Sequence, residues 1–207
     1  MKYTNDNTIL LFDLHDVIFT FDYKKVAKIL WNSKDKWKIF TILFHPFFIL
    51  QLIKMAWHDA TDEEFYAIFE KRRPQLLPLI INITNAQKII PGMDKLIENL
   101  AQRGYELHVG SNIGPSRFKQ LSADFPHIMP HFKKVKIVQP GTHPLIRKPT
   151  EQFFKEYVQE HNGQNKQVVF IDDQKKNVNA ADAFGMTAIL CRSPKQLQEQ
   201  LKKLGIL

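Results

Sequence analysis

Two carboxylates and an imidazole follow a short apolar run near the N-terminus. The run covers residues 8–12, and Asp13, His15 and Asp16 come directly after it. A short apolar run of this kind predicts a buried strand of a parallel sheet. Ligands of such sheets bind at the carboxyl ends of the strands, so we expect Asp13 to stand at the mouth of a site. On this stretch alone, a strand followed by a plain acidic turn explains the residues equally well.

Two later strand candidates also end in polar side chains. Residues 105–109 predict a strand leading to Ser111, and residues 167–171 predict one ending at Asp172 and Asp173. Adjacent acids repel each other and ordinarily need a cation or a basic partner. Because the carboxyl ends of parallel strands meet at one edge of the sheet, we expect all these side chains to share one site.

Helical and strand patterns alternate from residue 91 to the end of the chain. A helix begins at Pro91-Gly92 and ends at Gly104, and a last helix begins at Ser193. Between them the patterns predict two further strands, over 134–138 and 187–190. They also predict one helix over 150–160 and another that runs through Ala180 to Phe184. This alternation with short links predicts an α/β fold with a doubly wound parallel sheet.

The stretch between the first strand and this alternating part has no strand pattern. Thr61-Asp62-Glu63-Glu64 has the spacing of a capping box, and prolines divide the stretch into short helices. We therefore expect a core domain formed by residues 1–20 and 86–207, with an α-helical insertion over 21–85.

Composition bounds the class of protein. The chain has 207 residues, 44% of them hydrophobic, which suits one globular domain or a core with an inserted subdomain. Its net charge of +8 favours anionic ligands, which include phosphate esters, nucleic acid and an acidic membrane face. The basic residues are scattered, without a reading helix or an aromatic platform, so we do not expect nucleic acid as a partner.

Cys191 is the only cysteine and no secretory signal is visible, so we expect a reducing, cytoplasmic location.

One stretch has the composition of a membrane-contacting segment. Residues 39–53 are strongly apolar but shorter than the ~20 residues that a membrane-spanning helix needs. We interpret the stretch as a buried helical hairpin or kinked helix. Peripheral membrane contact through residues 39–57, helped by the flanking lysines and tryptophans, is the less favoured alternative.

Four segments, in this order, resemble the motifs of the haloacid dehalogenase-like (HAD) hydrolase superfamily. They are residues 12–18 (FDLHDVI), 107–112 (LHVGSN), 147–150 (RKPT) and 169–174 (VFIDDQ). The resemblance covers nearly the whole chain outside the insertion. It implies a Rossmann-like core and a separate cap, formed by the insertion, that lies over the strand ends of this core. Tyr66, Arg72 and Arg73 are candidate substrate contacts from that cap.

The resemblance also implies a catalytic machinery. Asp13 would be the nucleophile that forms an aspartyl-phosphate. Ser111, Asn112 and Lys148 would bind the phosphoryl group of a small phosphorylated or otherwise anionic substrate, and Ser111 and Lys148 would also stabilise developing charge.

The same resemblance implies a bound magnesium ion. Mg²⁺ prefers oxygen ligands and keeps several waters. The implied protein ligands are Asp13, the backbone carbonyl of His15 and Asp173, with Asp172 as a further ligand or as a residue that orients the others.

His15 departs from the pattern of the family's phosphatases, which carry an acid at this position to protonate the leaving group and later to activate water. An imidazole can serve as acid and base near neutral pH. Losing this proton transfer typically costs ~10²–10⁴-fold in rate. We therefore expect a weak or selective Mg²⁺-dependent phosphomonoesterase.

Two alternatives remain open. One is a catalytically impaired binding protein for a phosphorylated ligand, a partner protein or a membrane surface, suggested by His15 and by the aromatic residues of the insertion. The other is a 2-haloacid dehalogenase, whose halide leaves without a proton. Such enzymes tend to replace the metal-binding acids, whereas Asp172 and Asp173 are present here.

Overall fold

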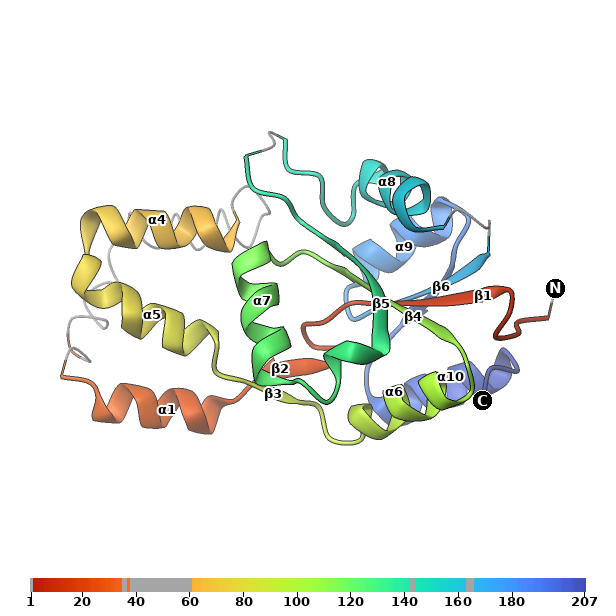
Figure 1. The fold of residues 1–207 in the computed structure, drawn as a ribbon, viewed down its shortest axis with the longest axis horizontal. Helices are drawn as coiled ribbons and strands as arrows, with labels where there is room; N and C mark the ends of the chain where they lie inside the picture. Colours follow the sequence, from red (N-terminus) through yellow and green to blue (C-terminus); the bar gives the residue numbers. More distant parts are fainter. Residues whose placement is uncertain (1, 35–36, 38–60, 142–143, 163–165) are drawn as a thin grey trace.

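The computed structural model shows a five-stranded parallel sheet with helices on both faces (Figure 1). It describes residues 2–34, 37, 61–141, 144–162 and 166–207. The sheet has the order β5-β4-β1-β6-β7. Its strands are β1 Thr8–Phe12, β4 Glu106–Ser111, β5 Phe132–Ile137, β6 Gln167–Asp172 and β7 Thr187–Leu190. The predicted doubly wound α/β fold is confirmed.

Strand β1 lies at the centre of the sheet and pairs in parallel with β4 on one side and β6 on the other. The chain therefore adds strands first on one side of β1 and then on the other. This reversal opens a crevice at the carboxyl ends of the central strands, which is where ligands of such sheets bind. Asp13 follows β1 directly at this point.

Alternate residues of β1 face the two layers of helices. Leu10 and Phe12 belong to one buried apolar cluster, and Leu11 belongs to the other. The first cluster includes residues of α6 (Met93–Gln102) and α10 (Pro194–Lys203), and the second includes residues of α8 (Glu151–His161) and α9 (Lys175–Ala183). Each such side chain contributes ~1.5–3 kcal/mol on full burial, so a strand covered on both faces is firmly held.

Helix α6 shows how closely the apolar pattern determines the packing. Its four buried residues, Met93, Leu96, Ile97 and Leu100, share the face expected from a 3.6-residue period. Gly104 has a φ of 82°, which favours glycine and ends the helix before β4.

The structure also differs from the predicted elements. Strands β4, β5 and β6 each include one or two residues outside the predicted ranges. Helix α7 (Pro115–Asp124) was not predicted, because Leu121 is its only buried residue and its apolar face is therefore weak. Strands β2 (Phe19–Phe21) and β3 (Gln87–Ile89) pair in an antiparallel ribbon, and at three residues each they are too short to give a pattern.

The described helices of the insertion are α1 (Tyr23–Asn32), α4 (Asp62–Arg72), the 3-10 helix η1 (Pro74–Leu76) and α5 (Leu77–Thr84). They lie at the end of the molecule opposite both termini (Figure 1). The capping box at Thr61 is confirmed, since Thr61 Oγ1 accepts from Glu64 N and Glu64 Oε2 accepts from Thr61 N. The β2–β3 ribbon joins the insertion to the core. The exact division of the chain into core and cap stays a prediction.

The insertion and the core meet where α4 contacts α7. Glu63 Oε1 of α4 accepts a hydrogen bond of 2.8 Å from the backbone N–H of Ser116. Gly114 precedes α7, and a Cβ there would lie 2.0 Å from Glu63 Oε2. A glycine at this position thus lets a carboxylate reach the N-terminus of a helix, where backbone N–H groups favour negative charge.

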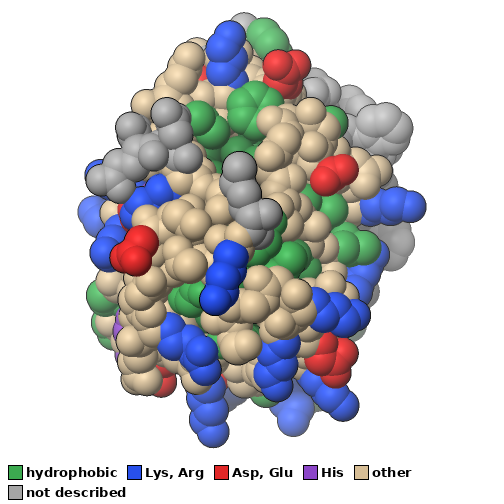
Figure 2. Space-filling model, turned by 90° about the vertical axis from the view of Figure 1, so that its right-hand side faces the viewer, with side chains coloured by type: hydrophobic (Ala, Val, Ile, Leu, Met, Phe, Trp, Pro, Cys, Tyr) green, Lys and Arg blue, Asp and Glu red, His purple; other side chains and the backbone are tan. Residues whose placement is uncertain are grey.

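The described part of the surface carries scattered basic side chains and two exposed tryptophans, and one lysine is buried in an ion pair. On the face that carries the termini, Lys and Arg side chains are spread among other residues (Figure 2). Lys136 is only 8% exposed and pairs with Glu156 and Glu160 of α8. Trp31 and Trp37 of the insertion are 78% and 72% exposed.

Residues 39–57 lie outside the described residues. The buried hairpin or kinked helix predicted over 39–53, and the alternative membrane contact through 39–57, therefore stay predictions. Every helix in the part of the chain that is described is too short or too polar to cross a lipid bilayer.

Gly114→Ala should weaken the contact between α4 and α7. The new Cβ would push the flexible Glu63 side chain away and break its bond to Ser116 N, at a cost of ~1 kcal/mol. We expect faster hydrogen exchange in α4. Ser116→Ala is the control, because it keeps the backbone N–H and should leave exchange unchanged. Equal exchange in the wild type and Gly114→Ala would contradict this contact.

Candidate active site

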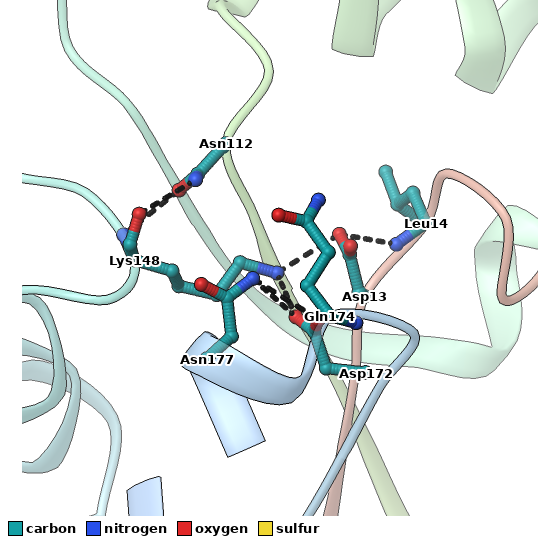
Figure 3. A network of polar contacts seen from close by, with 7 residues as sticks. All are labelled: Asp13, Leu14, Asn112, Lys148, Asp172, Gln174 and Asn177. Atoms are coloured by element: carbon teal, nitrogen blue, oxygen red, sulfur yellow. Dashed lines mark hydrogen bonds and ion pairs between the residues drawn. The ribbon is translucent and has the colours of Figure 1, made fainter. Parts of the chain in front are cut away.

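A fully buried lysine joins two carboxylates at the carboxyl edge of the sheet (Figure 3). Lys148 Nζ lies 3.0 Å from Asp13 Oδ1 and 2.7 Å from Asp172 Oδ2. Asp13 follows β1 and Asp172 ends β6, so the two acids come from neighbouring strands. A lysine before a proline is ordinarily solvated, and its burial here indicates that the two charges hold it in place.

Asp172 accepts hydrogen bonds on both of its oxygens. Its Oδ1 accepts from the backbone N–H of Gln174 at 2.8 Å and from Asn177 Nδ2 at 3.0 Å. Its Oδ2 accepts from Lys148 Nζ and, at 3.1 Å, from Asn177 Nδ2. With both oxygens engaged in this way, Asp172 is suited to orient Lys148 and the neighbouring backbone.

Asn112 fixes the backbone of Lys148. The Asn112 amide donates to the Lys148 carbonyl at 2.9 Å and accepts from the Lys148 N–H at 2.8 Å. Asn112 follows Ser111 at the end of β4, so this pair of bonds ties the lysine loop to a third strand (Figure 3). The loop that carries Lys148 leads into α8.

Asp13 is oriented by its own neighbours. Its Oδ1 accepts from the Leu14 backbone N–H at 2.7 Å. Burial raises the pKa of Asp13, and Lys148 and the neighbouring Ser111 hydroxyl oppose this shift. Burial alone would lower the pKa of Lys148, but the charges of Asp13 and Asp172 raise it, so the ammonium stays charged.

Asp173 completes a cluster of three carboxylates. Ligand atoms of Asp13, Asp172 and Asp173 all lie within 4.8 Å of one another. Burial and the charges of Asp13, Asp172 and Asp16 raise the pKa of Asp173 to about 6. Its Oδ1 is buried and has no hydrogen-bond partner among the described residues.

These residues fit a divalent cation. The three carboxylates and one ammonium of the cluster leave two negative charges uncompensated when all are ionised. The unpaired Asp173 oxygen offers a ligand, and oxygen donors are what Mg²⁺ takes in proteins. The backbone carbonyl of His15 as a further ligand stays a prediction.

His15 stands beside the cluster in a partly apolar setting. Its side chain is 35% exposed, its ring meets Phe21 edge-to-face at 5.1 Å, and its Nε2 lies 3.6 Å from Asp16 Oδ2. Burial lowers the pKa of His15, Asp16 opposes this shift, and Arg117 adds to it. The imidazole is therefore mostly neutral near pH 7, a state that accepts a proton more readily than it donates one.

A cavity of about 200 Å³ opens over these groups. The predicted residues Asp13, His15, Ser111 and Asn112 line it, together with residues that the sequence did not single out: Phe21, Asp62, Ile113, Arg117, Gln174 and Asn177. None of the predicted cap contacts, Tyr66, Arg72 and Arg73, is among the described lining residues. The described insertion residue that lines the cavity is instead Asp62. Asp62 hardly stands out in the sequence, where it reads as part of a helix cap.

All the predicted site residues therefore gather at one edge of the sheet: Asp13, His15, Ser111, Asn112, Lys148, Asp172 and Asp173. Asp16 is absent from the described lining of the cavity. Its φ of 55° turns the chain, and its carboxylate contacts Thr20 and His15. The chemical roles of these residues remain predictions.

The family profile for haloacid dehalogenase-like hydrolases matches residues 49–191. This is more than half of the chain and includes Ser111, Lys148, Asp172 and Asp173, while Asp13 precedes it. The chain therefore belongs to the haloacid dehalogenase-like hydrolases, as the four motifs predicted. A comparison with curated protein sequences finds no match.

Solved structures of similar fold span nearly the whole chain. A HAD family enzyme from Bacteroides thetaiotaomicron has 18% identity and a TM-score of 0.69, covering 97% of this chain and 99% of its own. A second structure of it, in complex with magnesium and inorganic phosphate, has 18% identity and a TM-score of 0.62, with coverage of 90% and 95%.

Two other similar structures come from different enzymes. The HAD-hydrolase YfnB from Bacillus subtilis, bound to magnesium, has 17% identity and a TM-score of 0.63, with coverage of 95% and 99%. L-2-haloacid dehalogenase from Xanthobacter autotrophicus, with chloropropionic acid covalently bound, has 14% identity, a TM-score of 0.60 and coverage of 99% and 85%. Identities this low show a shared fold.

Lys148→Met should strongly destabilise the protein, because it leaves Asp13 and Asp172 buried without a cation. We expect a loss of ~3–5 kcal/mol in the free energy of unfolding, measured with urea at pH 7. Lys136→Met is the matched control, since its partners Glu156 and Glu160 are 22% and 48% exposed. That change should cost ~1 kcal/mol or less. Equal losses in the two variants would contradict the role of Lys148.

Proposed function

We propose that this hydrolase is a Mg²⁺-dependent phosphomonoesterase acting through an aspartyl-phosphate on Asp13. The observation that carries the proposal is the Asp13–Lys148–Asp172 arrangement beside Asp173, whose Oδ1 has no hydrogen-bond partner in the part of the chain that is described. In this proposal the arrangement supplies a buried nucleophile, a fixed positive charge and a cation site, and the nucleophile Asp13 lines the cavity. An anionic phosphoryl group needs all three.

The nucleophile is held ready for attack. The Leu14 N–H and Lys148 Nζ restrict the Asp13 carboxylate, so little ordering remains to be done when the substrate binds. An Asp13 oxygen attacks phosphorus, the P–O bond to the alcohol breaks, and the alkoxide leaves with the electron pair. Water then attacks the aspartyl-phosphate and releases phosphate and the free carboxylate.

The groups around Asp13 stabilise the charge of the transferring phosphoryl group. The Lys148 ammonium offsets negative charge on Asp13 and on the phosphate, and the Ser111 hydroxyl donates to a phosphoryl oxygen. Asp13 and Asp173, with the carbonyl of His15, would hold Mg²⁺. When bound, the ion supplies positive charge that lowers the repulsion between the carboxylate and the phosphate dianion. Asp172 acts by orienting Lys148.

The poor ability of His15 to donate a proton limits the rate of ester hydrolysis. In its mostly neutral state it can accept a proton from the attacking water, but it is a poor donor to a leaving alkoxide. We therefore propose that esters with good leaving groups are hydrolysed faster than alkyl esters. The cavity, bounded by Asp62 of the insertion, restricts the enzyme to small substrates.

Two alternatives compete with this proposal. Dehalogenation needs no cation. A dehalogenase would therefore have no use for the three-carboxylate cluster or for Asp173 Oδ1, which has no hydrogen-bond partner among the described residues. A purely binding role is supported by the exposed Trp31 and Trp37, which suit a partner surface. Measuring chloride release from 2-chloropropionate beside phosphate release from an aryl phosphate separates the two hydrolases.

Asp13→Asn should abolish hydrolysis of p-nitrophenyl phosphate, because the amide is a poor nucleophile. We expect wild-type turnover only with Mg²⁺ present, and a loss of at least ~10³-fold in the variant. The control is Asp94→Asn, an acid in the first turn of α6 that is outside the described lining of the cavity. Unchanged turnover in Asp13→Asn would contradict the assignment of the nucleophile.

His15→Asp should raise the rate, because a carboxylic acid at this position can protonate the leaving oxygen. The gain should be ~10-fold or more for an alkyl phosphate such as glycerol 3-phosphate and smaller for p-nitrophenyl phosphate, whose leaving group needs little protonation. The measurement is kcat for both substrates in both proteins. A rate that does not change for either substrate would indicate that the imidazole already serves as the acid.

A further inference from the structure

Arg117 is a cation in the cavity to which the proposed chemistry gives no task. It lies in the first turns of α7, and its side chain is 11% exposed. It lines the same cavity as Asp13 and His15. Its guanidinium carbon lies 5.8 Å from the centre of the Phe21 ring. The side chain thus lies between the Phe21 ring and the Asp62 carboxylate.

The hydrogen bonds of Arg117 are incomplete. Its Nη1 lies 3.5 Å from Asp62 Oδ1, which is the outer limit for a hydrogen bond. Its Nε is buried and has no acceptor among the described residues. Leaving a buried donor on a charged group without an acceptor costs more than leaving a neutral one, so the site is incomplete without a further acceptor.

The position of Arg117 matches one part of a substrate. The proposed chemistry assigns the phosphoryl group to Asp13 and Ser111, and the lining of the same cavity also includes Phe21, Asp62, Ile113 and Arg117. If the proposed phosphatase function holds, the alcohol part of the ester lies among these side chains. A cavity of about 200 Å³ admits only a small alcohol.

We propose that Arg117 is a specificity-determining residue that binds a carboxylate on the alcohol part of the substrate. The preferred substrates are then small phosphate esters of hydroxy acids. This inference rests on the proposed function. Arginine presents two parallel N–H groups that match a carboxylate, and the free Nε belongs to such a pair. A hydroxyl group would use one of these donors and neutralise none of the charge.

Asp62 moderates this contact. Its carboxylate lies beside Nη1, so it keeps the guanidinium in place but repels a second carboxylate. Removing the charge of Asp62 should therefore strengthen the preference for an anionic substrate. A purely structural role for the Asp62–Arg117 pair makes no such prediction, because its loss would lower activity on all substrates alike.

The test compares glycerate 3-phosphate with glycerol 3-phosphate, which differ in a carboxylate in place of a hydroxymethyl group. The reference substrate is p-nitrophenyl phosphate. We expect kcat/KM in the wild type to favour the glycerate ester by about 10- to 100-fold, the range of a charged hydrogen bond. Arg117→Gln should remove this preference, Arg117→Lys should keep part of it, and Asp62→Asn should increase it. Lys119→Gln, which removes an exposed charge from the same helix, is the control and should leave it unchanged.

Three results would overturn the inference: a wild type that prefers glycerol 3-phosphate, one with no preference, or a preference that survives in Arg117→Gln. If none of the three substrates is hydrolysed, the proposed function fails and calorimetry decides about Arg117. Tighter binding of the glycerate ester by the wild type than by Arg117→Gln would then support the carboxylate contact. Equal or absent binding would overturn it.

Discussion

The site depends on one buried cation. Lys148 sits between Asp13 and Asp172 and joins the ends of β1 and β6 to the loop before α8. A lone ammonium or a lone carboxylate at this depth would be very costly, so each of these groups is tolerated only because the others are present. Asn112 extends the same connection to β4 through the backbone of Lys148. Asp13, Ser111 and the adjacent Asp172 and Asp173 are thereby held in one arrangement.

The same charges explain why the cluster is suited to a cation. Lys148 compensates only part of the negative charge of Asp13, Asp172 and Asp173. Burial, together with the remaining negative charge, raises the pKa of Asp173. The protein thus stores electrostatic repulsion at the strand ends, and a bound divalent ion would relieve it. The contact of Glu63 with the start of α7 places the insertion over this edge of the sheet, with Asp62 at the wall of the cavity.

Much of this arrangement could be predicted from the sequence. Apolar runs ending in Asp13, Ser111 and Asp172 indicated parallel strands, and the convergence of such strands gave the shared site. Residues whose position depends on long-range contacts could not be found in this way. Arg117 belongs to a helix with a weak apolar face, and Asp62 reads as part of a capping box. The burial of Lys148 could be inferred only from the family resemblance, because the local sequence is typical of a solvated lysine.

Calorimetric titration with Mg²⁺, in the presence and absence of inorganic phosphate, tests the cation site most directly. We expect the wild type to bind Mg²⁺, more tightly with phosphate present, and Asp173→Asn to bind it at least ~10-fold more weakly. Asp182→Asn, an exposed acid at the end of α9, should bind as the wild type does. A wild-type protein that takes up no Mg²⁺ even with phosphate would contradict a site in which Asp13 and Asp173 share one ion.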